Sequence, residues 1–221
     1  MAPTTITSFD LFGTLVDARR PDDPAAAVAA ELAARDVPVP ADWAAAFREY
    51  HLDLPDGVEL SLPEHAVAAL ESRDVELSDV AGTDEAGNAL VHQAVLEAYD
   101  PPTVTTREDA AAAVRAAAAV GPVGVLSNCT VPKLVPRVLA RSDLDLATFD
   151  AVVSSVECGW RKPHRLAFET VAERLDGTTE DLVHVGDDPL ADGGAEAAGA
   201  TCHLIGETSL ADLPAVFGDA P

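Results

Sequence analysis

Five short apolar runs, separated by stretches with helical periodicity, constrain the fold more than any other feature of the sequence. They lie near residues 5–10, 122–127, 149–154, 182–186 and 201–205. Runs of this length that alternate with helices are typical of α/β proteins, in which a parallel sheet is buried between two layers of helices. The sequence therefore predicts an α/β fold with a doubly wound parallel sheet.

Polar side chains follow three of these runs at the point where each run ends. The runs that begin at positions 6, 123 and 182 lead into Asp10, Gly13 and Thr14, into Ser127 and Asn128, and into Asp187, Asp188 and Asp192. Ligand crevices in α/β proteins open at the carboxyl ends of parallel strands. We therefore expect these residues to lie together at one edge of the sheet.

A long helical block separates the first two apolar runs. Apolar residues recur at helical spacing over residues 25–35, 41–52, 63–72 and 85–99, with Pro, Gly and Asp between the segments. An Ala-rich helix is also expected near residues 110–120. The pattern predicts a Rossmann-like core of residues 1–16 and 103–221, and an inserted helical-bundle domain of residues 17–102.

Four segments, in this order, resemble the signatures of the haloacid dehalogenase-like hydrolase superfamily. They are Phe9-Asp10-Leu11-Phe12-Gly13-Thr14, Ser127-Asn128, Arg161-Lys162-Pro163, and Gly186-Asp187 with Asp192. The resemblance implies that Asp10 is a nucleophile that forms a covalent intermediate, and that Lys162 neutralises charge on Asp10 and the transferred group. It also implies that residues 17–102 form a helical cap of the kind inserted directly after the first signature.

The resemblance favours a phosphatase that depends on Mg²⁺ and acts on a small phosphate ester through an aspartyl-phosphate. The implied metal ligands are the carboxylates of Asp10, Asp187 and Asp192, with Asp188 as a further candidate, and the backbone carbonyl of Phe12. The implied phosphate-binding residues are Gly13, Thr14, Ser127 and Asn128. The expected partner is a small phosphorylated molecule.

Phe12 departs from the phosphatase pattern, which has a second Asp at this position as a proton donor. The 2-haloacid dehalogenases, which need no metal, have an aromatic residue there, so Phe12 favours that alternative. Asp187 and Asp188 oppose it, because those enzymes normally have Ser and Asn in this region and because carboxylates repel an anionic haloacid unless a cation lies between them. A weakly catalytic binding or regulatory protein is the third alternative.

The charge of the chain excludes some partners. Thirty-eight acidic residues stand against 14 basic ones, for a net charge of -24, and only positions 133 and 162 are Lys. Because no basic stripe is present, nucleic acid is not an expected partner. Acid enrichment with little Lys resembles the proteins of halophiles, whose molar salt screens such repulsion, so we expect a halophilic archaeon as the source.

The remaining residues predict little specific chemistry. Cys129, Cys158 and Cys202 have no metal-ligand spacing, and His184 lies between two valines and is interpreted as a packed core residue. No targeting segment and no apolar stretch that could span a bilayer is visible, so we expect a cytoplasmic protein without a membrane partner. A monomer and a homodimer are both compatible with the sequence.

Overall fold

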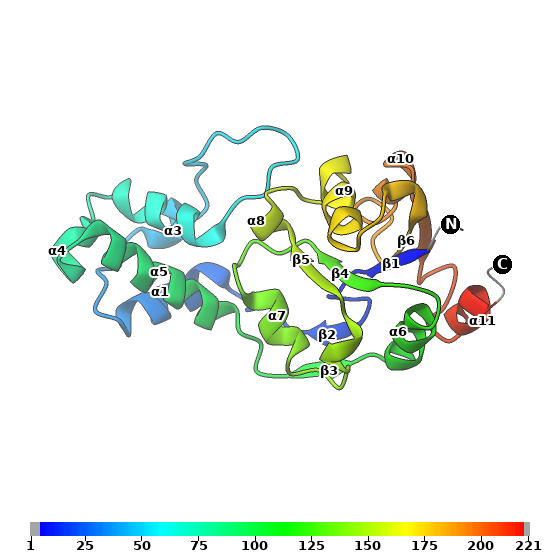
Figure 1. Ribbon diagram of the computed structural model, residues 1–221. Helices are drawn as coiled ribbons and strands as arrows, with labels where there is room; N and C mark the ends of the chain where they lie inside the picture. Colours follow the sequence, from blue (N-terminus) through cyan, green and yellow to red (C-terminus); the bar gives the residue numbers. More distant parts are fainter. Residues whose placement is uncertain (1–4, 219–221) are drawn as a thin grey trace.

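The computed structural model describes residues 5–218 and has a five-stranded parallel sheet at its centre (Figure 1). The strand order is β5 (Ala151–Ser154), β4 (Val123–Ser127), β1 (Ile6–Phe9), β6 (Leu182–Gly186) and β7 (Thr201–Leu204). Every neighbouring pair is parallel. Since each predicted apolar run forms a strand of this sheet, the predicted doubly wound α/β fold is confirmed.

Helices cover both faces of the sheet. One face packs against α6 (Ala110–Ala118), α7 (Leu134–Leu139) and α11 (Leu213–Gly218), and the other against α9 (Arg165–Arg174) and α10 (Gly194–Ala197). The short helix α8 (Ser155–Cys158) follows β5 directly. Apolar side chains of the strands divide between two buried clusters, one on each face, as expected for strands buried on both sides. None of the helices in residues 5–218 combines the length and apolar character needed to cross a membrane.

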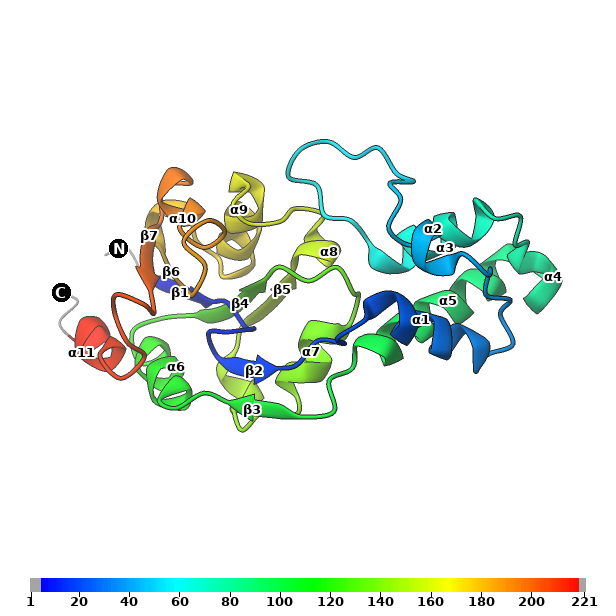
Figure 2. The same cartoon turned by 180° about the vertical axis from the view of Figure 1, so that it is seen from behind.

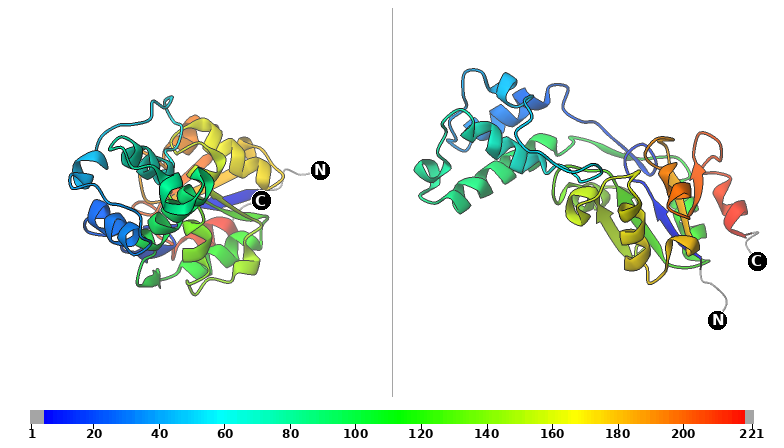
Figure 3. Two further views of the ribbon diagram at one scale, coloured as in Figure 1. Left: turned by 90° about the vertical axis from the view of Figure 1, so that its left-hand side faces the viewer. Right: turned by 90° about the horizontal axis from the view of Figure 1, so that it is seen from above.

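Five helices are inserted between β2 (Val16–Ala18) and β3 (Val104–Thr106), which pair as a two-stranded antiparallel ribbon. These helices are α1 (Pro24–Ala33), α2 (Trp43–Ala46), α3 (Leu62–Glu71), α4 (Leu77–Ala81) and α5 (Asp84–Tyr99). We call residues 24–99 the helical segment. It lies to one side of the sheet, so that the molecule is elongated (Figures 1 and 3). The boundaries of the predicted core and cap domains stay a prediction.

The predicted helix over residues 41–52 is wrong in its length, because α2 ends at Ala46. The Ala46 carbonyl, which would accept from the Tyr50 N–H in a continuing helix, accepts from the Glu49 N–H and lies 2.7 Å from His51 Nε2. The chain then runs as a long loop to Ser61 (Figure 2). A side chain has therefore replaced the helical hydrogen bond that the apolar spacing alone predicted.

This long loop returns to the core beside the strand ends. The Glu59 N–H donates to the Gly159 carbonyl (3.0 Å), and the Arg161 N–H donates to the Gly57 carbonyl (2.9 Å). A further bond joins the Leu62 N–H to the Thr130 carbonyl (2.9 Å). These contacts hold Glu59, which is buried, against the core next to the candidate site described below.

Candidate active site

The carboxyl ends of β1, β4 and β6 surround one cavity of about 220 Å³. Asp10 follows β1, Ser127 ends β4, and Asp187 lies directly after β6. Of the site residues that the sequence predicted, only Gly13 and Thr14 do not line this cavity. The predicted residues that line it are Asp10, Phe12, Ser127, Asn128, Lys162, Asp187, Asp188 and Asp192. The fold thus brings together side chains that are far apart in the sequence, as parallel strand ends do.

Lys162 lies between two buried carboxylates. Its Nζ donates to Asp10 Oδ1 (2.8 Å), to Asp192 Oδ1 (2.5 Å) and to the Leu126 carbonyl (2.8 Å). The ammonium therefore uses all three of its donors. Lys162 is only 2 % exposed, and Asp10 is 7 % exposed. A fixed cation with no remaining donor can neutralise Asp10 but cannot leave it easily.

The pKa values at this cluster follow from burial and from an excess of acid. Burial raises the pKa of Asp10, and the nearby charges of Asp192 and Asp187 raise it further, while Lys162 opposes them. Burial by itself would lower the pKa of Lys162, but Asp10 and Asp192 keep it above its ordinary value. Lys162 is therefore charged at neutral pH, and it serves more carboxylates than it can neutralise.

Asp192 is held from four directions. Its Oδ1 accepts from Lys162 and lies 2.9 Å from His184 Nε2, and its Oδ2 accepts from the backbone N–H groups of Asp187 (3.0 Å) and Asp188 (2.9 Å). Burial would raise the pKa of Asp192, but the hydrogen bond from His184 and the charge of Lys162 hold it below its ordinary value. Its carboxylate organises both Lys162 and the loop that carries Asp187.

His184 belongs to this network, and the interpretation of it as a merely packed residue is wrong. Its Nδ1 lies 2.8 Å from Ser8 Oγ, and burial lowers the pKa of the ring to about 4, so the imidazole is neutral at pH 7. Because the Asp192 carboxylate can only accept, Nε2 carries the proton, and Ser8 donates to Nδ1. A His within an apolar strand was the available signal, but its partner Ser8 is set by the register of β1 against β6.

Asp187 lies beside Asp10 at the mouth of the cavity. Its Oδ1 accepts from Thr14 Oγ1 (3.1 Å), and its Oδ2 lies over Gly13, where an added Cβ would come within 2.6 Å of it. Gly13 also has a φ of 88°, which favours glycine. The turn after β1 therefore leaves space for the Asp187 carboxylate and orients it.

The donor set fits Mg²⁺ bound by few side chains. Within residues 5–218, no group of three or more His, Cys, Asp or Glu side chains is arranged to hold a metal. Asp192 is engaged by four hydrogen-bond donors, which leaves Asp10 and Asp187 as the main available carboxylates. Mg²⁺ commonly uses one or two carboxylates together with carbonyl, water and phosphate oxygens, so a third carboxylate is not required.

Ser127 and Asn128 differ in what their side chains do. Ser127 Oγ is buried and has no hydrogen-bond partner within the described chain, although it lines the cavity. A buried hydroxyl without a partner points to an oxygen of a ligand. The Asn128 amide donates to the Lys162 carbonyl (2.9 Å) and accepts from the Lys162 N–H (2.8 Å), so it positions the lysine.

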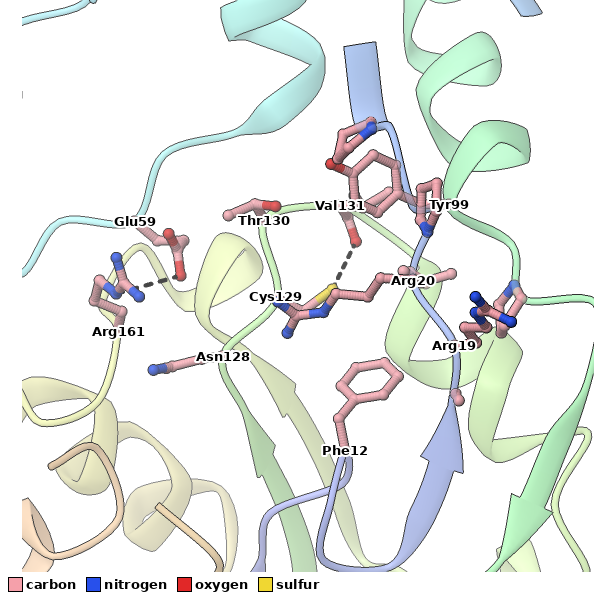
Figure 4. A pocket seen from close by; sticks show the side chains of 15 residues that line it. Phe12, Arg19, Arg20, Glu59, Tyr99, Asn128, Cys129, Thr130, Val131 and Arg161 are labelled. Atoms are coloured by element: carbon pink, nitrogen blue, oxygen red, sulfur yellow. Dashed lines mark hydrogen bonds and ion pairs between the residues drawn. The ribbon is translucent and has the colours of Figure 1, made fainter. Parts of the chain in front are cut away.

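A second cavity, of about 300 Å³, lies between the helical segment and the core (Figure 4). It shares Phe12, Arg20 and Asn128 with the first cavity. The Phe12 ring points into it, and the Arg20 side chain crosses above that ring (Figure 4). Cys129 also lines it, but burial raises the pKa of this thiol to about 11, so it is not a thiolate nucleophile. No sequence motif indicated Arg20.

The sequence and the fold of this chain are similar to those of known proteins. A family model described as haloacid dehalogenase-like hydrolase matches residues 7–199. The fold is similar to that of a 2-haloacid dehalogenase from Pseudomonas syringae, with a TM-score of 0.64 and 22 % identity over 90 % of this chain and 84 % of that one. It is also similar to a predicted phosphoglycolate phosphatase from Haemophilus somnus, with a TM-score of 0.55 and 19 % identity over 91 % and 85 %.

A third similar structure is CbbY from Rhodobacter sphaeroides in complex with xylulose-1,5-bisphosphate, with a TM-score of 0.55 and 16 % identity over 90 % of this chain and 84 % of that one. The chain matches no curated protein. At these identities the solved structures support a common fold, and their names include both a 2-haloacid dehalogenase and a predicted phosphatase.

Proposed function

The chain belongs to the haloacid dehalogenase-like hydrolase family, and within this family we propose that it is a phosphatase acting on a small phosphate ester. The observation that carries the proposal is the excess of acid at the nucleophile. Asp187 and Asp192 both raise the pKa of Asp10, and Lys162 is shared. A divalent cation bound here would lie between these carboxylates and an anionic phosphate ester, so that the pair adds no net negative charge, whereas an anionic haloacid alone would add to the excess.

In the proposed reaction, Asp10 is the nucleophile. Lys162 holds its Oδ1, while Oδ2 accepts no hydrogen bond from residues 5–218 and attacks phosphorus. The bond from phosphorus to the leaving-group oxygen breaks, and the electron pair leaves with that oxygen. Water then attacks phosphorus of the aspartyl-phosphate, which releases inorganic phosphate and restores the Asp10 carboxylate. Ser127 donates its unpaired hydroxyl to a phosphoryl oxygen.

Asp10, Asp187 and the Phe12 carbonyl would hold Mg²⁺, with Asp188 as a further ligand. When bound there, the cation would neutralise charge on the phosphoryl oxygens. Asp192, in this proposal, holds Lys162 and the Asp187 N–H in place. A contact of Asp192 with the metal, directly or through water, stays a prediction.

Phe12 is the observation that favours a second candidate, a 2-haloacid dehalogenase. Its ring lines both cavities and supplies an apolar surface where a proton donor is expected in a phosphatase. Asp10 would then attack carbon and displace halide without metal. The two candidates differ in the atom attacked and in the need for a cation, so they can be separated by experiment.

The separating experiment offers the purified protein, in high salt, 4-nitrophenyl phosphate with Mg²⁺ or with EDTA, and separately 2-chloropropionate with halide release measured. Turnover of the phosphate ester only with Mg²⁺ is expected. Halide release with EDTA present would instead support the dehalogenase, and activity on neither substrate would support the weakly catalytic alternative. Asp10→Asn should abolish turnover without changing the melting temperature by more than about 3 °C, and activity within about tenfold of the parent would exclude Asp10 as the nucleophile.

Phe12 also predicts how the phosphatase should select leaving groups. General acid catalysis contributes about 10²- to 10⁴-fold and matters most for poor leaving groups, and Phe12 cannot supply the proton. We therefore expect a steep dependence of kcat/KM on leaving-group pKa across a series of phosphate esters, and a shallower one for Phe12→Asp. Phe12→Leu is the matched control and should keep the steep dependence. Equal, shallow slopes in the parent and Phe12→Asp would show that another group donates the proton.

A further inference from the structure

Arg20 stands out among the cations near the site because nothing in the described chain neutralises it. Two other arginines line the same second cavity, and both have a carboxylate nearby: Arg19 pairs with Asp22 at 2.9 Å, and Arg161 lies 4.0 Å from Glu59. Within residues 5–218, no carboxylate lies within ion-pair distance of Arg20. Arg48, Arg115 and Arg174 are also not seen in ion pairs within residues 5–218, but none of them lines either cavity.

The position of Arg20 connects it to the reacting atoms. It lines both the cavity around Asp10 and the second cavity, and Figure 4 shows its guanidinium beside Cys129, on the side that faces Asn128. Its charge opposes the effect of burial on the pKa of the Cys129 thiol, which is consistent with this placement. A guanidinium at this junction faces whatever extends from the nucleophile into the second cavity.

A bound phosphate ester would extend in that direction. Lys162, Asp192 and the end of β4 enclose the inner side of the Asp10 cavity, and all of them are buried. The second cavity adjoins it across Phe12 and Asn128, and its volume of about 300 Å³ suits a leaving group of small-molecule size. The leaving group would therefore lie over the Phe12 ring with Arg20 above it.

We propose that Arg20 binds a carboxylate on the leaving group, so that the substrates are phosphate esters whose leaving group is a small carboxylic acid. The proposal rests on the function proposed above. A guanidinium matches a carboxylate bidentately, and such charge-assisted hydrogen bonds are stronger than those between neutral groups. Arg20 is exposed, so its charge is available to a ligand. A carboxylate fits better than a second phosphate because one unpaired guanidinium compensates one charge, and Glu59 in the same cavity would repel a dianion.

Position 12 holds Phe instead of a proton-donating acid, and this restricts the proposed substrates further. Without protonation, the leaving oxygen must depart as a stable anion, which an acyl, enol or aryl oxygen does better than an alkyl one. The geometry thus combines two requirements on one substrate: a carboxylate for Arg20 and a leaving oxygen of low pKa. The first requirement comes from Arg20, which lies outside the family signatures, and the second comes from Phe12, which lies within the first signature.

The test compares two aryl phosphates of similar size, 4-carboxyphenyl phosphate and its neutral amide, 4-carbamoylphenyl phosphate. We measure kcat/KM with Mg²⁺ for the parent, Arg20→Gln, Arg20→Lys and a control, Arg48→Gln, which removes an exposed arginine that lines neither cavity. Arg20→Gln should lower kcat/KM about 10- to 100-fold for the carboxylate ester and less than about threefold for the amide. Arg20→Lys should lie between, and Arg48→Gln should change neither ester by more than about twofold.

Three outcomes would overturn the proposal. Equal losses on both esters in Arg20→Gln would show that Arg20 acts on the phosphoryl group or on folding, and no loss on either would show that it does not touch the substrate. A parent that hydrolyses 4-phosphonophenyl phosphate faster than the carboxylate ester would assign Arg20 to a second phosphate-like group instead.

Failure of the phosphatase function itself is distinguishable from failure of this proposal. If the parent hydrolyses neither ester, an NMR titration with 4-hydroxybenzoate, and with 4-hydroxybenzamide as its neutral control, still tests Arg20 without turnover. Weaker binding of 4-hydroxybenzoate alone in Arg20→Gln, by about tenfold, supports the carboxylate site. Equal binding of 4-hydroxybenzoate by the parent and Arg20→Gln overturns it.

Discussion

Several clusters within residues 5–218 join one cation to two carboxylates, and two of them, one buried and one exposed, do so at nearly the same distances. At the strand ends, Lys162 lies 2.8 Å from Asp10 and 2.5 Å from Asp192. In the helical segment, Arg73 lies 2.9 Å from Asp42 and 2.6 Å from Glu49. The clusters differ in exposure: the side chains of the first are 1–9 % exposed, and those of the second are 24–58 % exposed.

This difference in exposure reverses the effect on the pKa of Asp10, though not on that of Asp192, which His184 and Lys162 together hold below its ordinary value. Hydrogen bonds from Arg73 hold the pKa values of Asp42 and Glu49 below their ordinary values, because water still solvates both carboxylates. Burial raises the pKa of Asp10 despite a lysine at a similar distance. Ion-pair distance alone therefore does not predict reactivity. A buried pair is costly to form and to break, whereas an exposed pair contributes little, so the buried cluster is the one suited to holding a reactive carboxylate.

The largest expected effect comes from breaking the buried cluster. Lys162→Met leaves Asp10 and Asp192 buried without their cation, which should destabilise the protein by about 3–5 kcal/mol and abolish turnover. Urea unfolding at pH 7 measures this. The difference in unfolding free energy between Lys162→Met and the parent should shrink as the pH falls through the raised pKa of Asp10, because protonation removes one of the uncompensated charges. A loss below about 1 kcal/mol would mean that the cluster is solvated like the one around Arg73.

His184 should produce the next largest effect, through pH. The pKa of its ring is lowered from 6.5 to about 4 in the folded protein, so the unfolded chain takes up the proton first as the pH falls. Stability is therefore fully present above about pH 6.5 and is lost between about pH 6.5 and 4, by up to about 3 kcal/mol.

The control for this prediction is His184→Gln, which can still donate to Asp192 and accept from Ser8 but does not titrate. Its unfolding free energy should depend less on pH over that interval than that of the parent. Identical pH profiles for the two proteins would show that His184 does not stay neutral in the folded state.

Salt should sharpen the comparison between buried and exposed charge. The net charge of -24 repels itself across the surface. The Debye length falls from about 10 Å at 0.1 M salt to about 3 Å at 1 M, so the melting temperature of the parent should rise by roughly 5 °C or more between 0.1 M and 2 M KCl. The loss of stability in Lys162→Met should persist at 2 M KCl, because salt screens buried charges less than surface charges. A melting temperature that stays constant or falls as KCl is added would contradict the expected halophilic origin.

The smallest effect is expected from the exposed cluster. Arg73→Gln should change the melting temperature by less than about 2 °C at 0.1 M KCl, since solvent screens both pairs, and the change should vanish at 2 M KCl. Differential scanning calorimetry at the two salt concentrations checks this. A shift as large as that of Lys162→Met would show that the Arg73 cluster is an anchor of the helical segment.

Much of the candidate site could be predicted because its residues occupy positions defined by local pattern. Asp10, Ser127 and Asp187 each follow an apolar run, and parallel strands carry such residues to one edge whatever the intervening chain does. The end of α2 at Ala46, well before residue 52, could not be predicted, because His51 competes for the Ala46 carbonyl, a contact that apolar spacing does not encode. The role of Asn128 was equally hidden, because its partner is the backbone of Lys162.

The sequence by itself determined the α/β class, the order of the strands along the chain, and the residues that end them, because these depend on periodicity and on short motifs. Only the tertiary structure decided which groups share a proton or a charge. The pairing of Ser8 with His184 depends on the register of two strands, and the placement of Arg20 depends on how the helical segment meets the core. Burial is the physical reason, because the pKa of the same Asp or His side chain differs between water and the core, and burial is a property of the assembled fold.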